Sequence, residues 1–312
     1  MRGETLAEPV GGVQTGCAPA CRHYPGRVTT TTTQPTRTTA LRVWANGRLY
    51  ADPEQARVGV TDHGLVVGDG VFEALKVTPA GPFALQRHLD RLDRSSAAMG
   101  LPAPDHALIR DAVAELLDGQ TIELAKIRIT YTAGRGPLGS GAAYGPQTLV
   151  VALDDAQPVD PVSHVVTAPW SRNEHGALAW VKSTSYGENV LALAYAAERG
   201  ADEALLLNTA GNVCEGTGSN VFCVFGSTVV TPPLSAGLLA GITRDLVLEW
   251  SEVEERDFTL AEALAADEVF LTSSIRDAQP VGRWDDTTFD VGPVTARLAQ
   301  TFADRSGADI EP

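Results

Sequence analysis

Hydrophobic and polar residues follow one another along the first half of the chain in patterns that predict short strands and two helices. Two apolar runs flank Asn46-Gly47, a dipeptide typical of a hairpin turn. Apolar residues at helical spacing predict helices over 85–99 and 105–117. Strict alternation or continuous apolar runs predict the strands of this half, which cover 71–77, 126–131 and 148–153.

The second half adds more strands, and its helices are grouped rather than interleaved with them. Cap-type residues over 183–187 precede a helix that runs to Glu198, and the last helix begins at Val294. Because strands cluster with strands, the pattern favours an α+β fold over repeated βαβ units. The other elements of this half are strands over 165–168, 203–207, 212–215, 220–225, 228–231 and 268–272, and helices over 243–250 and 260–266.

The same patterns divide the chain into three regions. The N-terminal residues have no hydrophobic period and contain a threonine run over 29–33, as disordered segments do. Pro158 and Pro161 interrupt the pattern after the last strand of the first half. We therefore predict a disordered extension over 1–41, a small N-terminal domain over 42–157 and a larger C-terminal domain over 158–312.

Composition narrows the classes of function. With a formal net charge of −15 over 312 residues, the surface repels nucleic-acid backbones and anionic membranes. No apolar run reaches the roughly 18 residues that a membrane-spanning helix needs. The four cysteines show no zinc-ligand spacing, so no metal site is predicted. We expect a cytoplasmic enzyme or binding protein that contacts neither nucleic acid nor a membrane.

Two common enzyme classes find no support in the motifs. Gly134-Arg-Gly-Pro-Leu-Gly139 matches the dinucleotide-binding fingerprint, but the following residues are rich in glycine and proline. They cannot form the helix whose N-terminus binds a pyrophosphate, so the match is predicted to be a loop. The chain has six histidines but no nucleophile-elbow sequence, which argues against a hydrolase of that type.

Three lysines are the only candidates for an amine nucleophile. Lys126 shares a strand face with Arg128 and is expected at a solvated surface. Lys76 ends a strand beside a Pro-Gly turn, again an ordinary surface position. Lys182 ends the apolar run that begins at Ala179 and precedes a helix, so we expect it at a buried strand-to-helix junction. Desolvation there lowers the pKa of the amine and frees it to form a Schiff base.

Further motifs of the second half complement this lysine. Glu215 places a carboxylate at the end of a strand, in a glycine-rich turn. Residues 237–243 put backbone amides and the Thr243 hydroxyl at a helix start, which is a geometry that binds phosphate. Thr272-Ser-Ser274 adds hydroxyls after a strand. Each feature alone has an ordinary explanation as a turn or a helix cap. Together with the lysine they are the groups that pyridoxal phosphate requires.

With these residues the chain resembles the class IV aminotransferases, a pyridoxal-phosphate family that contains branched-chain and D-amino-acid transaminases and aminodeoxychorismate lyases. The resemblance extends from about Val43 to the C-terminus. It rests on motifs that occur in the family's order: Gly68-Asp-Gly-Val-Phe-Glu73, His88-Leu-Asp-Arg-Leu92, Lys182, Ala201-Asp-Glu-Ala204, Glu215-Gly-Thr-Gly-Ser-Asn-Val-Phe222, Gly241-Ile-Thr-Arg-Asp245 and Asp267-Glu-Val-Phe-Leu-Thr-Ser273.

The resemblance implies a fold of two domains, pyridoxal-phosphate fold type IV, with the cofactor in the cleft between them. It also implies a homodimer in which partner residues lie near a small amino substrate. Lys182 matches the Schiff-base lysine and Glu215 matches the partner of the pyridine nitrogen. Tyr186 is placed near a cofactor oxygen. The positions that match the family's phosphate-binding residues are Arg91, Ile242, Thr243 and Ser274.

The resemblance leaves two reactions open, because both use Lys182 and Glu215. The arginine with which D-amino-acid transaminases bind a substrate carboxylate aligns near Ala133, which argues against D-amino acids. Gly134-Arg135-Gly136 resembles a loop of the lyases. We therefore predict an aminodeoxychorismate lyase, which forms 4-aminobenzoate and pyruvate, with a transaminase as the alternative. A third possibility, a binding module without activity, has no reason to keep this lysine, this carboxylate and the phosphate-binding residues together.

Overall fold

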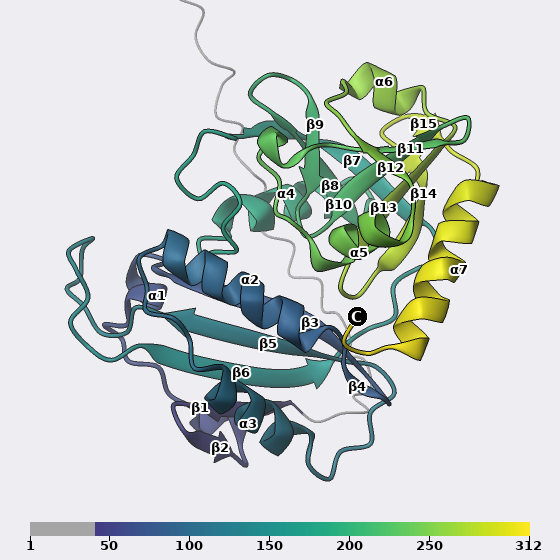
Figure 1. The fold of residues 1–312 in the computed structure, drawn as a ribbon. Coiled ribbons are helices and arrows are strands. Elements are labelled where there is room, and N and C mark those ends of the chain that lie inside the picture. The colour runs from purple at the N-terminus through teal and green to yellow at the C-terminus, as the bar shows by residue number, and fades with distance from the viewer. Residues whose placement is uncertain (1–40) are drawn as a thin grey trace, which may run out of the picture. The chain divides into compact units, whose positions relative to one another are not determined.

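Two β-sheets with helices on their faces make up residues 41–312, the part of the chain that the computed structural model describes (Figure 1). The predicted α+β class is confirmed, and the architecture is that of fold type IV. The predicted disordered extension over 1–41 lies outside the described residues, except for Leu41. Within 41–312, none of the helices has the length and apolar character that crossing a lipid bilayer requires.

The first sheet is antiparallel throughout, with the strand order β2-β1-β6-β5-β3-β4. Helices α2 (Leu85–Ala98) and α3 (His106–Leu117) bury their apolar sides in the core of this sheet. In β5 the predicted alternation is observed, because Ile127 is buried in this core while Lys126 and Arg128 are exposed. The strands are β1 (Arg42–Ala45), β2 (Arg48–Tyr50), β3 (Gly70–Thr78), β4 (Gly81–Pro82), β5 (Ala125–Thr132) and β6 (Thr148–Asp155).

The second sheet is mixed, with the order β12-β11-β10-β13-β14-β7-β8-β9, and β15 pairs with β14. Its parallel pairs are β7–β8, β7–β14 and β11–β12. The strands are β7 (Ser163–Arg172), β8 (Glu203–Asn208), β9 (Val213–Gly216), β10 (Asn220–Phe225), β11 (Thr228–Thr231), β12 (Val253–Glu255), β13 (Glu268–Ser273), β14 (Asp277–Trp284) and β15 (Thr287–Thr288).

Helices cover this second sheet because both of its faces are apolar. Phe222 and Phe270 stack with a centroid separation of 4.7 Å and pack against α5 (Ile242–Trp250) and α7 (Pro293–Ala308), which Figure 1 shows side by side. Their strand neighbours Val221 and Leu271 belong to a different core, with α6 (Leu260–Leu264). Helix α4 (Gly187–Ala197) packs on β7 and β8.

Most predicted elements are present, and the differences have local causes. Strand β14 was not predicted, because Pro280 and Gly282 interrupt its apolar pattern. A short helix that was not predicted, α1 (His63–Val66), begins after Asp62, which is its N-cap. The glycine-rich match over 134–139 lies in an irregular loop, as predicted.

The surface location predicted for Lys76 is wrong. Its side chain is buried, and its amine contacts both carboxylate oxygens of Asp277 at 2.6 and 2.7 Å. The Phe83 ring lies 5.5 Å from the same amine. The sequence could not reveal this ion pair, because the two partners lie far apart in the chain.

The predicted division at 157/158 falls in the connection between β6 and β7, so each sheet takes its strands from one side of it. The described residues nevertheless belong to one compact unit. A backbone hydrogen bond joins the two predicted domains: the amide of Phe72, in the first sheet, donates to the carbonyl of Lys182 at 2.9 Å. The domain boundary stays a prediction.

Candidate active site

A cavity of about 670 Å³ opens between the two sheets. Its walls come from β3, α2, the loop over 173–186, the turn after β9, the start of α5 and the turn after β13. All the site residues predicted from the sequence line this cavity: Arg91, Lys182, Tyr186, Glu215, Ile242, Thr243 and Ser274. Residues from distant parts of the chain therefore meet in one place.

Lys182 lies in a loop, not at a strand end as expected. Strand β7 ends at Arg172 and α4 begins only at Gly187. The loop is held by β-type contacts with the start of β3: the Phe72 amide donates to Lys182, and Val71 and Ser183 form an isolated bridge. These contacts fix the backbone beneath the amine without regular secondary structure around it.

The predicted capping of α4 is also wrong. Its N-cap is Tyr186, which makes no side-chain cap. The hydroxyls of Thr184 and Ser185 instead donate to the carbonyl of Gly68, at 2.9 and 3.2 Å. A side chain on Gly68 would collide with Ser185, because an added Cβ would lie 2.3 Å from its hydroxyl oxygen. The polar residues after Lys182 therefore tie the loop to β3 rather than starting the helix.

The amine of Lys182 is in an environment that favours its neutral form. Burial lowers its pKa to about 8, and the charge of Arg91 acts in the same direction. Its Nζ lies 4.5 Å from the centroid of the Phe72 ring and 5.7 Å from that of Tyr186. Those two rings meet edge to face at 5.1 Å. Burial, followed by the charge of Glu215, raises the pKa of the Tyr186 phenol to about 12, so the phenol keeps its proton at neutral pH.

Glu215 is buried at the end of β9 and lies opposite an arginine that the sequence analysis missed. Burial raises the pKa of the Glu215 carboxyl, and the Arg172 guanidinium opposes this shift. Arg172 Nη2 lies 3.3 Å from one carboxylate oxygen, and the Leu239 amide donates to the other at 2.9 Å. Arg172 ends β7 and lines the cavity. No spacing signal distinguished it in a chain rich in arginine.

Anion-binding groups gather at the start of α5. Ile242 and Thr243 form the first turn of this helix, where backbone amides are unpaired and favour an anion. Arg91 donates from Nη1 to the carbonyl of Ala240, directly before the helix, at 2.8 Å. Gly241, the N-cap of α5, packs closely against Asn220, because an added Cβ would lie 2.1 Å from the Asn220 side chain.

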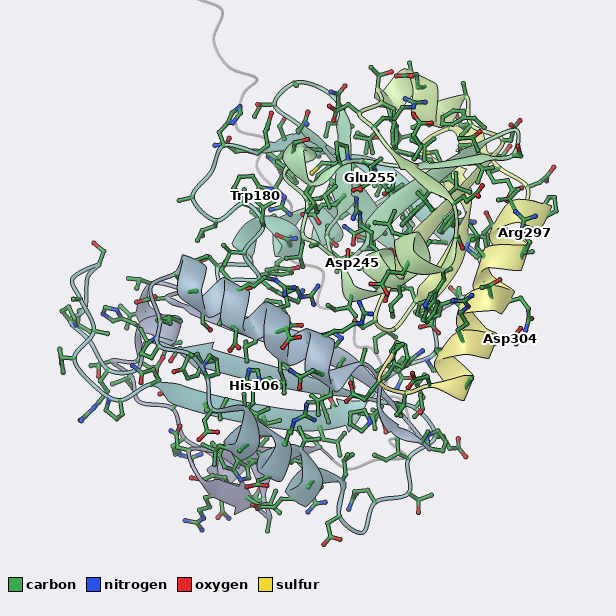
Figure 2. The ribbon with its side chains drawn as sticks, viewed as in Figure 1. His106, Trp180, Asp245, Glu255, Arg297 and Asp304 are labelled. Atoms are coloured by element: carbon green, nitrogen blue, oxygen red, sulfur yellow. The ribbon has the colours of Figure 1, made fainter. Side chains whose placement is uncertain are left out.

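Two more residues near the cavity were missed by the sequence analysis. Arg128 stands opposite Ala74, which lines the cavity, and its guanidinium lies 3.8 Å from the centroid of the Phe72 ring. Among residues 41–312 no carboxylate pairs with Arg128. Trp180 lines the cavity with φ of +67°, and its indole donates to Leu234 at 2.8 Å. Figure 2 shows Trp180 on the loop that precedes α4.

The cavity fits pyridoxal phosphate by the chemistry of its groups. It offers an amine that is readily deprotonated, a buried carboxylate and an anion-binding helix start. Thr272 adds a buried hydroxyl oxygen that lines the cavity without a hydrogen-bond partner among the described residues. A buried polar atom of this kind is expected where a ligand completes the site.

Comparison with known proteins agrees with this assignment of the cavity. The family model described as "Amino-transferase class IV" matches residues 70–284. A protein of Methanocaldococcus jannaschii, provisionally assigned as a branched-chain-amino-acid aminotransferase, is 35% identical over 280 residues, which cover 85% of this chain and 96% of that protein.

Two further matches carry other names. The D-alanine aminotransferase of Bacillus licheniformis is 32% identical over 260 residues, which cover 81% of this chain and 91% of the enzyme. A solved structure from Legionella pneumophila, provisionally assigned as a 4-amino-4-deoxychorismate lyase, superposes with a TM-score of 0.75 at 25% identity. That match covers 82% of this chain and 97% of the lyase chain.

Proposed function

The chain belongs to the class IV aminotransferase family, whose cofactor is pyridoxal 5′-phosphate, and from this premise we propose that it is a transaminase acting on amino acids and 2-oxo acids. The proposal rests above all on Arg128, an arginine without an acidic partner among the described residues, beside the ring that covers Lys182. A guanidinium of this kind suits the carboxylate that every amino acid and 2-oxo acid carries. The names of the curated relatives support the same reaction.

The lyase predicted from the sequence stays a prediction. It rested on the resemblance of Gly134-Arg135-Gly136 to a loop of the lyases. Arg135, like Arg128, is exposed and is not among the residues that line the cavity. One structural neighbour supports it, whereas the curated relatives described above are transaminases. The preference against D-amino acids also stays a prediction, and the D-alanine aminotransferase among the relatives speaks against it.

The residues of the cavity divide into three groups by their roles in the proposed reaction. When bound, pyridoxal phosphate supplies an aldehyde that condenses with amines and a ring that accepts electrons from the substrate carbon. Arg91, Thr243 and Ser274 would bind its phosphate, together with the amides at the start of α5. Glu215, whose negative charge the nearby Arg172 stabilises, would hold a proton on the ring nitrogen.

Lys182 would do the proton transfer. Because its pKa is lowered to about 8, part of the amine is neutral near physiological pH and can take the proton from the α-carbon of the amino acid. The same Nζ can then deliver that proton to the cofactor side, because the Lys182 backbone that carries it is held to β3. Phe72 and Tyr186 pack around the amine and exclude water from it.

The proposed reaction is tested by product analysis. The purified protein is incubated with pyridoxal phosphate and a panel of L- and D-amino donors, with pyruvate or 2-oxoglutarate as acceptor. Separate incubations supply aminodeoxychorismate, and all products are identified by mass. We expect amino transfer from at least one donor. Formation of 4-aminobenzoate without any amino transfer would overturn the transaminase proposal in favour of the lyase.

Arg128→Met is expected to raise KM for the amino donor about 10- to 100-fold, because a hydrogen bond to a charged group contributes about 1.5–3 kcal/mol. Cofactor affinity should stay unchanged, since Arg128 is not among the phosphate-binding residues. Lys126→Met is the matched control, because Lys126 is a cation on the same exposed strand face, two residues away. Equal KM values for the two variants would remove Arg128 from substrate binding.

We further propose that the protein is a homodimer, on the basis of apolar residues exposed near the cavity. Leu178 and Trp180 line the cavity and are 43% and 52% exposed. Helix α4 follows this loop and exposes Val190, Leu191 and Leu193. So many large apolar side chains in one stretch of chain are typical of a surface that a second copy covers.

Leu191→Asp is expected to shift the protein from dimer to monomer at micromolar concentration, because it places a charge on this apolar surface. Analytical ultracentrifugation measures the change. Val291→Asp is the control: Val291 is also about half exposed, but it precedes α7 instead of belonging to α4 or the loop before it, and Figure 1 shows α4 and α7 apart. A monomeric wild-type protein, or a dimer that survives Leu191→Asp, would contradict the assignment of this surface.

A further inference from the structure

We infer that Glu73 is a positioning residue for the phosphate end of the cavity: it holds the Arg91 guanidinium so that its free N–H groups are presented to a phosphate. The inference rests on the phosphate-binding role proposed above for Arg91 and goes one step beyond it. Glu73 is not among the residues that line the cavity, so it would act only through Arg91.

Glu73 is a completely buried carboxylate with three charged or polar donors around it. Arg91 donates from Nε to one oxygen at 2.8 Å and from Nη2 to the other at 2.7 Å. His88, one turn earlier on α2, places Nδ1 2.7 Å from that second oxygen. Burial alone would raise the pKa of Glu73, but the charge and hydrogen bonds of Arg91 outweigh it and hold the pKa far below its usual range. Glu73 is therefore an anion that accepts from both neighbours.

The donors of Arg91 are divided between the protein and the cavity. A guanidinium has five N–H groups in a fixed plane. Nε and one hydrogen of Nη2 bond Glu73, and one hydrogen of Nη1 bonds the Ala240 carbonyl. One hydrogen on each terminal nitrogen remains without a partner among the described residues, and Arg91 lines the cavity. Both hydrogens lie on the terminal nitrogens and can donate to a phosphate in the cavity.

This arrangement fixes the guanidinium from two sides. Glu73 comes from β3, and Ala240 directly precedes Gly241, the N-cap of α5. The guanidinium of Arg91 is thereby brought near the unpaired amides of the first turn of α5. A binding group held in place before the ligand arrives loses less entropy on binding. An arginine without these two contacts would lose side-chain conformational entropy when a phosphate binds.

The alternative is that Glu73 only stabilises the fold as a buried ion pair. Breaking such a pair is costly wherever it occurs, so loss of stability does not separate the two roles. A positioning role predicts a loss specific to the phosphate of the ligand. A merely structural role predicts equal loss for ligands with and without phosphate.

The test compares pyridoxal phosphate, pyridoxamine phosphate and pyridoxal on the full-length Glu73→Gln variant. Glutamine keeps the shape but offers one neutral acceptor and a donor. We expect dissociation constants of the two phosphorylated ligands to rise about 10- to 100-fold. That of pyridoxal, which has no phosphate, should change by less than about threefold. Arg91→Ala gives the reference for loss of the whole phosphate contact.

Glu249→Gln is the matched control. Glu249 pairs bidentately with Arg87, a residue of the same helix as Arg91, at 2.6 and 2.8 Å, but the pair is solvent-exposed and outside the cavity. It should leave all three dissociation constants unchanged, because exposed ion pairs contribute little.

Two results would overturn the inference: equal weakening of pyridoxal and pyridoxal phosphate in Glu73→Gln, or no weakening of either. If Glu73→Gln does not fold, Glu73→Asp keeps the charge with a shorter reach and is judged by the same ratio. The protection that inorganic phosphate gives the cofactor-free protein against thermal unfolding provides a second measure, and it should fall in the variant. All of these are binding measurements, so they stand even if the wild-type protein fails to transfer amino groups.

Discussion

Lys182→Ala is expected to abolish turnover, by about 10⁴-fold or more, while the protein stays folded. The amine is both the group that holds the cofactor and the proposed carrier of the proton, so no other side chain can replace it. The fold should survive, because the loop is held by the backbone of Lys182 and its neighbours, not by the amine. The phosphate should still bind through Arg91 and the start of α5.

Borohydride reduction followed by peptide mapping tests the assignment directly. Reduction fixes the cofactor to the amine that holds it, and we expect the label on Lys182. Lys126→Ala is the control for activity, because its amine is exposed. Lys76 is a poor control, since its amine pairs with Asp277 and its loss would destabilise the fold. A label on Lys76 or Lys126, or on no lysine, would contradict the mechanism.

The pH dependence of cofactor capture follows from the same amine. Only the neutral amine attacks an aldehyde, and burial lowers the pKa of Lys182 from the usual 10.5 to about 8. The rate at which cofactor-free protein binds pyridoxal phosphate should therefore rise as the pH passes through about 8 and level off above it. Stopped-flow absorbance measures this rate. A midpoint near 10.5 would mean that the amine is solvated rather than buried.

Glu215→Gln is expected to lower turnover about 10²-fold and to leave cofactor binding almost intact. A neutral amide cannot hold a proton on the ring nitrogen, so the ring accepts electrons less readily. The cofactor should remain, because Lys182 and the phosphate-binding residues are unchanged. Absorbance spectra and single-turnover rates separate the two effects.

Two variants sharpen the interpretation of Glu215. Arg172→Gln removes the charge that counteracts the effect of burial on the pKa of Glu215, so this pKa should rise further. As the pH is lowered, the variant should therefore lose activity at a higher pH than the wild type. Glu188→Gln is the control, because Glu188 also lies near Arg172, at 3.8 Å, but is largely exposed. Full activity of Glu215→Gln would show that this carboxylate does not support the ring nitrogen.

Predictions from sequence succeeded best where the information is local. Strands β10 and β11 were predicted at their observed bounds, because each reads as a short apolar run next to a glycine turn. Strand β14 escaped prediction because its pairing with β13 and β7 overrides the proline and glycine within it. The junction at Lys182 was misjudged for a related reason: its apolar neighbours lie in a loop that pairs with β3, not in a strand of their own.

The chain by itself indicated which residues would carry the proposed chemistry and in what order they occur. Each motif is a short segment whose residue types suit one chemical role, as the amine of Lys182, the carboxylate of Glu215 and the helix start at Thr243 do. That these segments meet in one cavity follows from the fold that the motifs imply.

Only the tertiary structure decided the environment of these groups. Arg172 beside Glu215, Arg128 over Phe72 and the burial of Lys76 depend on strands that are distant in the chain and adjacent in the sheets. An ionisable side chain acquires its pKa and its orientation from the atoms around it, and sequence spacing does not encode those distances. Glu73 is the clearest example. Its neighbours in the strand are apolar and do not explain a carboxylate there, whereas the hydrogen bonds from Arg91 do.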